Sequence, residues 1–290
     1  MQLCFDATRF GLGLKEAVEL AAFKGIAAVE YAFASFETTA KTQKLSASEK
    51  EYLADVAEAA QKAGTHIALI RLTALFDTSD KKLIKPFQQM MRKLSMVAAA
   101  VHCPKVAFAL KPGREEGWLE EAAEALRPVC EDMEKAGVKL LLSLSTPPVN
   151  RGRTLRQWRP LEPQEWRDLI ANCPGLALSF SAADCAWQNI DYLQILPGVV
   201  SAVEHVEAND VEINRALLVD SGLFGPLWWR YRRPGKGQID WRQLIEALKL
   251  YDYQGTISIH LDDEFIDESN GNLEESLDES VKLLKPLLKY

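Results

Sequence analysis

The chain has 290 residues, of which 48% are hydrophobic and 26% charged, and its formal net charge is −7. This negative charge argues against general nucleic-acid binding. No run approaches the roughly 18 uninterrupted apolar residues of a membrane span, and the opening MQLCFDATRF lacks the pattern of a signal peptide. We therefore expect a cytoplasmic protein with no membrane partner and no nucleic-acid partner.

Short apolar runs and helical patterns alternate along the chain. Runs suited to buried parallel strands occupy 2–5, 27–31, 66–71, 105–110, 138–143, 176–181, 200–207 and 255–260. Helical periodicity covers 14–24, 48–63, 81–101, 115–136, 163–172, 188–195, 241–250 and 272–288. Asp240 is placed to cap one helix, and Gly64 and Gly137 follow the ends of two others, where a left-handed residue is favoured.

Strict alternation of apolar strands and helices predicts a parallel sheet covered by helices on its faces. Eight such units favour closure into a (β/α)₈ TIM barrel, formed as a single domain by residues 1–290, and one barrel of this kind needs about 250 residues. An open doubly wound sheet is the alternative, and the absence of a GxGxxG pattern after the first strand counts against it.

Five cysteines are dispersed along the chain without a CxxC pair: Cys4, Cys103, Cys130, Cys173 and Cys185. An odd and scattered set indicates buried thiols in a reducing compartment, and neither a disulfide framework nor a zinc site.

The active site of such a barrel lies where its strands end. Here the predicted strand ends and the residues just after them are mostly ionisable: Asp6, Glu30, Arg71, Lys111, Ser143, Ser181, Asp184, Glu207, Asp210 and His260. Glu207 and His260 come from neighbouring strands and suit a base and an acid. A structural role stays open, because Asp6 and Glu30 could cap loops or pair with Arg71, and His260 could be a hydrogen-bonded core histidine.

Two segments are rich in arginine and contain no acidic residue. Residues 146–160 hold Arg151, Arg153, Arg156 and Arg159, and residues 228–238 hold Arg230, Arg232, Arg233 and Lys236. Such loops at one barrel mouth would attract an anion, which arginine binds through bidentate hydrogen bonds. The residues predicted to bind substrate are Arg71, Lys111, Arg151, Arg153, Asp184, Arg230 and Arg232.

The side chains of these two segments could also serve the fold or an assembly. The arginines could pair with acidic helices or with a partner subunit. The nearby aromatic residues Trp158, Trp228, Trp229 and Tyr231 could stack on a sugar or form an oligomer contact. An exposed Trp228–Trp229 pair would favour a homodimer.

The closing segment GKGQIDWRQLIEALKLYDYQGTISIHLDDE resembles the xylose-isomerase-like superfamily of TIM barrels. That superfamily holds sugar isomerases, sugar phosphate epimerases, inosose dehydratases and endonuclease IV. VEHVEAND is similar to its pattern V-x-H-V-H-L-K-D, and LSFSAADCAW is similar to L-x-F-D-P-x-H. The resemblance runs along most of the chain and is most specific in the last 90 residues.

The resemblance implies a divalent metal held by Glu, Asp, His and Glu at the ends of strands five to eight, with the two glutamates moving the proton. In this sequence those positions carry Ser143, Ser181, Glu207 and His260, and a substrate-contacting histidine falls on Asp184. Only Asp210 keeps its type. Serine is a poor ligand for divalent ions, so we expect Mn, Mg or Zn to bind weakly or not at all. A rearranged site of Asp184, Glu207 and His260 is the alternative.

Two hypotheses for the function follow. One is a sugar isomerase or epimerase that acts on a small anionic carbohydrate, a sugar phosphate or sugar acid, with Glu207 and His260 as catalytic residues. The other is a non-catalytic barrel that binds a ligand or partner. A three-zinc endonuclease is excluded, because only His205 and His260 of the four histidines fall near the site.

Overall fold

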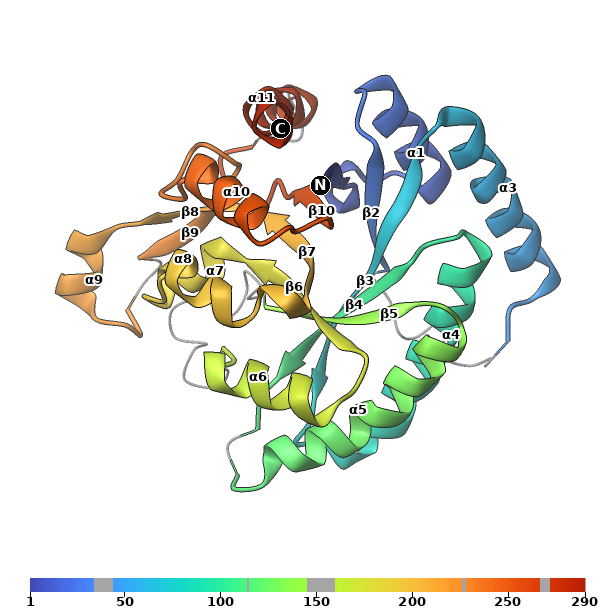
Figure 1. Ribbon diagram of the computed structural model, residues 1–290, viewed down its shortest axis with the longest axis horizontal. Coiled ribbons are helices and arrows are strands. Elements are labelled where there is room, and N and C mark those ends of the chain that lie inside the picture. The colour runs from blue at the N-terminus through green and yellow to red at the C-terminus, as the bar shows by residue number, and fades with distance from the viewer. Residues whose placement is uncertain (34–43, 114, 145–159, 226–227, 267–271, 290) are drawn as a thin grey trace.

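The computed structural model describes residues 1–33, 44–113, 115–144, 160–225, 228–266 and 272–289. Eight parallel strands close into a barrel in the order β1-β10-β7-β6-β5-β4-β3-β2, with helices around it (Figure 1). The strands are β1 (Gln2–Asp6), β2 (Ala28–Phe33), β3 (His66–Asp77), β4 (Lys105–Lys111), β5 (Lys139–Ser143), β6 (Leu176–Ser181), β7 (Val203–Ala208) and β10 (Thr256–Ile259). The predicted TIM barrel is thus confirmed.

The helices follow the predicted alternation, with short additions after β6 and β7. They are α1 (Leu14–Phe23), α3 (Ala47–Ala63), α4 (Lys81–Ala100), α5 (Trp118–Lys135), α6 (Pro163–Asn172), α7 (Ala182–Trp187), α8 (Tyr192–Ile195), α9 (Arg215–Ser221), α10 (Trp241–Leu250) and α11 (Asn272–Leu288). The described residues also include the short 3-10 turns η1 (Thr8–Phe10), η4 (Leu196–Gly198) and η5 (Val200–Ala202). Within the described ranges, every helix is too short or too polar to cross a membrane.

The predicted helix ends have the expected geometry. The Asp240 carboxylate accepts the backbone N–H of Gln243 at 2.9 Å, and Gly64 and Gly137 have φ of 67° and 69°. Several boundaries differ from the prediction, and β3 continues to Asp77, beyond its expected end at residue 71. Of the helix expected over 188–195, only α8 (Tyr192–Ile195) is helical, and an additional helix, α7, precedes it, capped by the Ser181 hydroxyl, which accepts the N–H of Asp184. The strand expected from residue 200 begins at Val203 because η5 precedes it.

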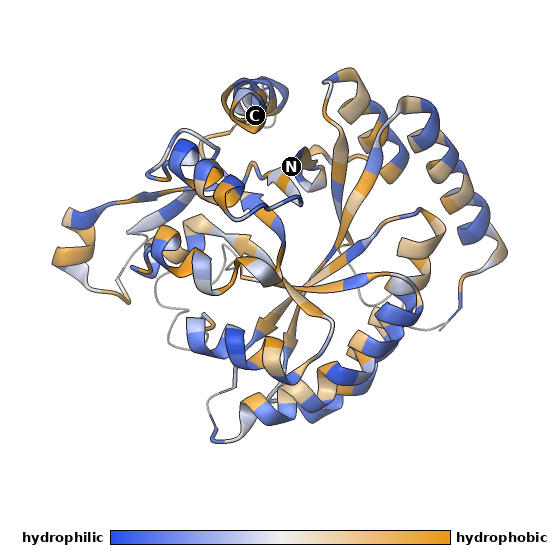
Figure 2. Cartoon of the chain, in the orientation of Figure 1, coloured by the Kyte–Doolittle hydropathy of each residue, from blue (hydrophilic) through white to orange (hydrophobic). Residues whose placement is uncertain are grey.

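The core lies mainly between the barrel and its helices. Large apolar residues on the strands, such as Phe5, Phe108 and Phe180, are fully buried there, and Figure 2 shows hydrophobic strands inside helices whose outer surfaces are more polar. Two smaller apolar groups lie apart from this core: Leu69, Ala107, Leu141 and Ala177 in one, and Cys4, Ala28 and Ala68 in the other. All five cysteines are buried and unpaired.

An antiparallel hairpin follows β7, formed by β8 (Asp210–Ile213) and β9 (Trp229–Arg232). Trp228 and Trp229 are only 2% and 1% exposed, and Trp229 stacks on Trp187 with ring centroids 4.6 Å apart. The expected exposed tryptophan pair is therefore wrong. Alternation along β9 turns Trp229 and Tyr231 inward, so these rings contribute to the core and offer no dimer surface.

Asp210 fastens this hairpin to the start of α10. Its carboxylate accepts the backbone N–H groups of Gly235 at 3.0 Å and Ile239 at 2.9 Å, and the indole N–H of Trp241 at 3.2 Å. A Cβ at Gly237 would lie 2.3 Å from Asp210 Oδ1, so only glycine fits this close approach. The role of Asp210 in this structure is to organise the loop.

Candidate active site

Five side chains form a polar cluster inside the barrel: Glu30, Arg71, His205, Glu207 and His260. We call these residues the central cluster. They come from β2, β3 and β7 and from the residue that follows β10. Glu30, His205 and Glu207 have no exposed surface, and His260 is 1% exposed. The Arg71 side chain retains 14% of its exposure, so it is the member that reaches toward the barrel mouth.

Glu30 is the hub of the cluster. Its Oε1 accepts the Arg71 Nε–H at 2.6 Å and also pairs with Arg71 NH2. Its Oε2 lies 3.0 Å from His205 Nε2 and 2.9 Å from His260 Nε2. Burial by itself would raise the pKa of Glu30, but Arg71 and His260 outweigh it and hold that pKa well below its usual range. Glu30 is therefore a carboxylate, and both histidines donate to it.

Arg71 and His260 are two cations that share this carboxylate. Arg71 NH2 lies 3.0 Å from His260 Nε2; because both nitrogens donate to Glu30, this contact is not a hydrogen bond between them. Burial opposes the charge on His260, yet Glu30 raises its pKa to about 9. Burial likewise opposes the charge on Arg71, and Glu207 and Glu30 raise its pKa. The site thus holds two fixed positive charges at neutral pH.

Glu207 lies on the other side of these cations. Its Oε1 accepts the hydroxyls of Ser143 at 2.9 Å and Ser179 at 2.7 Å. Its Oε2 is 3.5 Å from Arg71 NH1 and 3.9 Å from His260 Nδ1. The two residues predicted as base and acid are therefore brought together, within ion-pair distance. Ser143, which takes the place of a metal-binding glutamate in the resemblance, donates a hydrogen bond to Glu207.

Asp184 forms hydrogen bonds with residues other than Glu207 and His260. Its carboxylate accepts the Ser181 hydroxyl at 2.6 Å, the Trp187 indole N–H at 3.1 Å and the Tyr231 hydroxyl at 2.8 Å. Among the described residues, the group that could converge on a metal, with ligand atoms within 4.8 Å of one another, is Glu30, His205 and His260. The rearranged trio of Asp184, Glu207 and His260 is therefore not assembled.

A divalent metal does not fit the residues present. Ser143 and Ser181 supply hydroxyls that are already committed to carboxylates, and hydroxyls are weak ligands for such ions. In the group of Glu30, His205 and His260, both imidazoles donate Nε2–H to Glu30 Oε2. A metal there would have to displace these protons and sit beside the Arg71 guanidinium, 3.0 Å from His260 Nε2.

The other predicted substrate-binding residues have acidic partners or lie elsewhere. Lys111 pairs with Asp77 at 2.6 Å. Arg230 pairs with Glu212 at 2.5 Å, and Arg232 pairs with the same glutamate and with Asp263 at 3.1 Å. The expected pairing with an acidic helix is seen for Arg233, which lies 2.8 Å from Glu279 of α11, whereas the partners of Arg230 and Arg232 lie outside the helices. Arg151 and Arg153 lie outside the described residues.

The sequence did not predict the part that His205 and Asp6 take in the site. Hydrogen-bond partners place His205 inside the barrel, and strand alternation could have predicted this, because residues 205 and 207 share one face of β7. Asp6 of β1 lies beside Glu30 of β2 in the register of the sheet. Burial and the charge of Glu30 raise the pKa of Asp6 to about 6, a shift that depends on neighbours from other strands and has no local signal.

Several solved structures of known proteins have the same architecture. The chain aligns over 98–100% of its length with three solved structures: D-psicose 3-epimerase from Clostridium cellulolyticum H10 (14% identity, TM-score 0.72, 100% of that chain), 3-keto-D-glucoside 4-epimerase from E. coli (14%, 0.70, 99%) and the probable 3-DHS dehydratase AsbF from Bacillus anthracis (14%, 0.70, 99%). These likenesses establish the fold. No curated protein matches the sequence. The model of one protein family, described as xylose isomerase-like TIM barrel, matches residues 23–287. The chain therefore belongs to the xylose isomerase-like TIM barrel family.

Proposed function

We propose that the protein isomerises or epimerises a small anionic carbohydrate, a sugar phosphate or sugar acid, without a divalent metal. The observation that carries this proposal is the placement of Glu207 Oε2 at 3.5 Å from Arg71 NH1 and 3.9 Å from His260 Nδ1. Removal of a proton next to a carbonyl uses a base together with groups that stabilise the developing oxyanion, and this arrangement offers both. Two of the similar solved structures are sugar epimerases, which supports this class.

Each group has a defined part in this scheme. Glu207 accepts the proton from the carbon next to the carbonyl, with its other oxygen held by Ser143 and Ser179. Negative charge then develops on the carbonyl oxygen, and preorganised cations in a buried site stabilise such charge strongly. Arg71 and His260 are these cations, and Glu30 orients both. An isomerisation is completed when protonated Glu207 returns its proton to the adjacent carbon, while His260 carries a proton from one substrate oxygen to the other. An epimerisation is completed when His260 protonates the opposite face of the same carbon and recovers its proton from Glu207. Arg71 also makes the first contact with an anionic substrate, since it is the exposed member.

A non-catalytic barrel is the second candidate, and one observation favours it. Glu207 and His260 are almost fully buried and have protein partners on both sides, as in a structural ion cluster that stabilises the barrel. Buried ion clusters shift pKa values just as active sites do. In this case Arg71 would bind a ligand or form part of a partner surface, and no conversion would follow.

Turnover of a panel of sugar phosphates and sugar acids, followed by NMR, separates the two candidates. For an enzyme, Glu207→Gln and His260→Asn should each lower kcat by at least about 100-fold, the usual contribution of a positioned acid or base, while ligand affinity changes little. Glu121→Gln, an exposed carboxylate on α5 paired with Lys81, is the matched control. Saturable binding without conversion in the wild-type protein would refute the enzymatic proposal and leave the binding barrel.

A further inference from the structure

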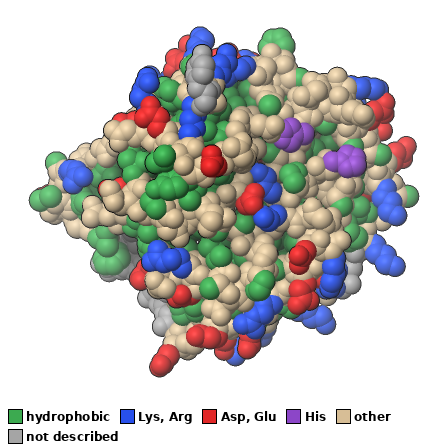
Figure 3. All heavy atoms as spheres, viewed as in Figure 1, with side chains coloured by type: hydrophobic (Ala, Val, Ile, Leu, Met, Phe, Trp, Pro, Cys, Tyr) green, Lys and Arg blue, Asp and Glu red, His purple; other side chains and the backbone are tan. Residues whose placement is uncertain are grey.

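A pocket of about 800 Å³ lies on the barrel face opposite to the central cluster. It is lined by the residues at the starts of β4, β5 and β7 and by the segments that precede β6 and β10. Apolar walls come from Val138 and Val200, and Lys105 lies at its base. The described acidic and basic side chains are interspersed on the face seen in Figure 3, so any preference for charge at the pocket is local.

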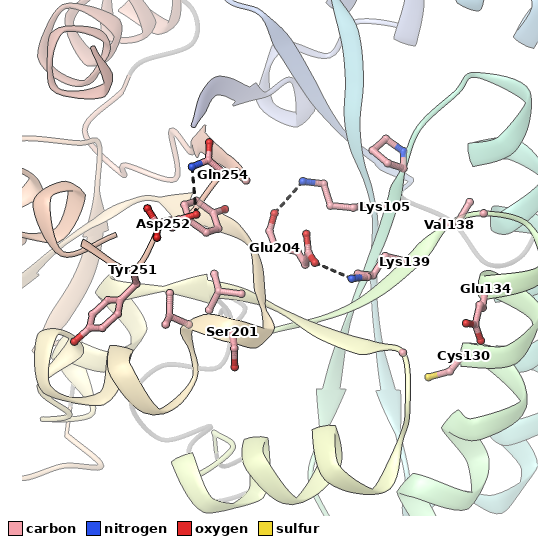
Figure 4. A pocket seen from close by; sticks show the side chains of 17 residues that line it. Lys105, Cys130, Glu134, Val138, Lys139, Ser201, Glu204, Tyr251, Asp252 and Gln254 are labelled. Carbon is pink, nitrogen blue, oxygen red and sulfur yellow. Dashed lines mark hydrogen bonds and ion pairs between the residues drawn. The ribbon is translucent and has the colours of Figure 1, made fainter. Parts of the chain in front are cut away.

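Lys105 is a buried cation whose hydrogen bonds go to neutral acceptors. The residue is 8% exposed, and its Nζ donates to the backbone carbonyl of Glu204 at 2.9 Å and to the Thr256 hydroxyl at 3.1 Å. The Glu204 carboxylate is directed instead to Lys139 Nζ at 2.7 Å, as Figure 4 shows. Within the part of the chain that the structure describes, no carboxylate forms an ion pair with Lys105.

The strand register explains this imbalance of charge. Lys105 and Lys139 are directly paired residues of β4 and β5, and the carboxylate of Glu204 forms its ion pair with Lys139, while Lys105 reaches only the backbone carbonyl of that residue. Buried charges in proteins are normally paired, and burial lowers the pKa of Lys105. A ligand oxyanion at the base of the pocket would supply the missing negative charge. Glu134 and Asp252 also line the pocket, and they disfavour a ligand that is anionic at both ends.

Lys105 is also the first member of a hydrogen-bonded chain through the barrel. Lys105 Nζ donates to Thr256 Oγ1, which lies 2.6 Å from His205 Nδ1. His205 Nε2 in turn donates to Glu30 Oε2 at 3.0 Å. Burial lowers the pKa of His205, so this ring is neutral and its Nδ1 accepts the Thr256 hydroxyl. Every donor in the chain therefore points from the pocket toward Glu30 in the central cluster.

We propose that this pocket is a second binding site, for a small molecule with one carboxylate or phosphate group that pairs with Lys105, and that its occupancy is sensed at the central cluster. The oxyanion accepts the remaining N–H of the ammonium group, and the body of the ligand packs against Val138 and Val200. The bound anion keeps Lys105 charged and its donation to Thr256 in place. The orientation of Thr256 and His205, and through them Glu30, then depends on the ligand.

The test is an NMR titration of the full-length protein labelled with ¹⁵N at lysine and histidine side chains. Inorganic phosphate and acetate are the two probes, and chloride at equal ionic strength is the control. We expect a saturable shift of the Lys105 signal and a rise in Tm with at least one probe, and the probe that binds more tightly identifies the headgroup. Lys105→Met should weaken the affinity by at least about tenfold, while the exposed control Lys82→Met should leave it unchanged.

Ser201→Trp is a second variant, for the case in which Lys105→Met does not fold. The new side chain at the exposed rim fills the pocket while Lys105 is retained, and it should also weaken binding. Thr256→Val interrupts the chain; it should preserve the shift at Lys105 but remove the ligand-dependent shift of the His205 ring. The absence of a saturable shift with either anion, or equal affinity in Lys105→Met or Ser201→Trp, would overturn the binding site. A His205 shift that persists in Thr256→Val would overturn the coupling.

Discussion

Replacement of Arg71 by methionine tests whether the central cluster is held together by charge compensation. The guanidinium forms ion pairs with both buried carboxylates, Glu30 and Glu207. Methionine keeps much of the side-chain volume but leaves these carboxylates with His260 as their remaining charged partner within the cluster. Loss of one partner from a buried ion cluster costs about 3–5 kcal/mol, against a total stability of about 5–15 kcal/mol for a typical domain.

Urea unfolding followed by far-UV ellipticity measures this cost. Lys111→Met is the matched control, because its ion pair with Asp77 is partly exposed, at 36% and 23% of the two side chains, and such pairs contribute about 0–1 kcal/mol. The double variant Arg71→Met/Glu30→Gln should recover part of the loss by removing the unpaired carboxylate. A cost for Arg71→Met no larger than that of Lys111→Met would refute the reasoning.

Three further predictions address metal, pH and packing. Calorimetric titration with Mn²⁺ or Zn²⁺ should show no stoichiometric binding. Stoichiometric heat together with a raised Tm would contradict the conclusion that a divalent metal does not fit the site. The folded-state pKa of His260 is about 9, above its ordinary value, so its contribution to stability should be complete below about pH 6.5 and lost as the pH rises through 9. This contribution should amount to about 3 kcal/mol. The free energy of unfolding of His260→Gln in urea should not vary with pH in this way. Trp229→Ala removes a buried ring that stacks on Trp187 and should cost about 3–5 kcal/mol, and thermal unfolding with little loss of Tm would show that the ring is not packed as described.

The fold could be predicted from the sequence because its signals are local. Eight apolar runs separated by helical periodicity predicted a closed barrel, and the residues that cap helices, such as Asp240 and Gly64, marked element ends correctly. The errors fell where tertiary contacts decide. Trp228 and Trp229 looked like exposed residues of a loop, but the hairpin partner β8 and the Trp187 ring bury them.

The candidate site was predicted only in part. Position at strand ends indicated Glu207 and His260, which the barrel does bring together. Whether an arginine is available to an anion depends on partners distant in sequence, such as Asp263 for Arg232, and composition gives no sign of them. For Glu30, the pair with Arg71 was an alternative that the sequence left open, and the structure contains it. Its hydrogen bonds with His205 and His260, which come from β7 and the end of β10, had no signal in the sequence.

The attachment of the hairpin to α10 by Asp210 bears on how the barrel mouth can move. Since one buried carboxylate accepts hydrogen bonds from Gly235, Ile239 and Trp241, the loop before α10 cannot swing outward without exposing an unpaired charge. Amide protons of Gly235 and Ile239 should therefore exchange with solvent as slowly as those of the barrel strands. We therefore expect any rearrangement that admits or releases a ligand to involve other parts of the barrel mouth, while the loop before α10 stays in place.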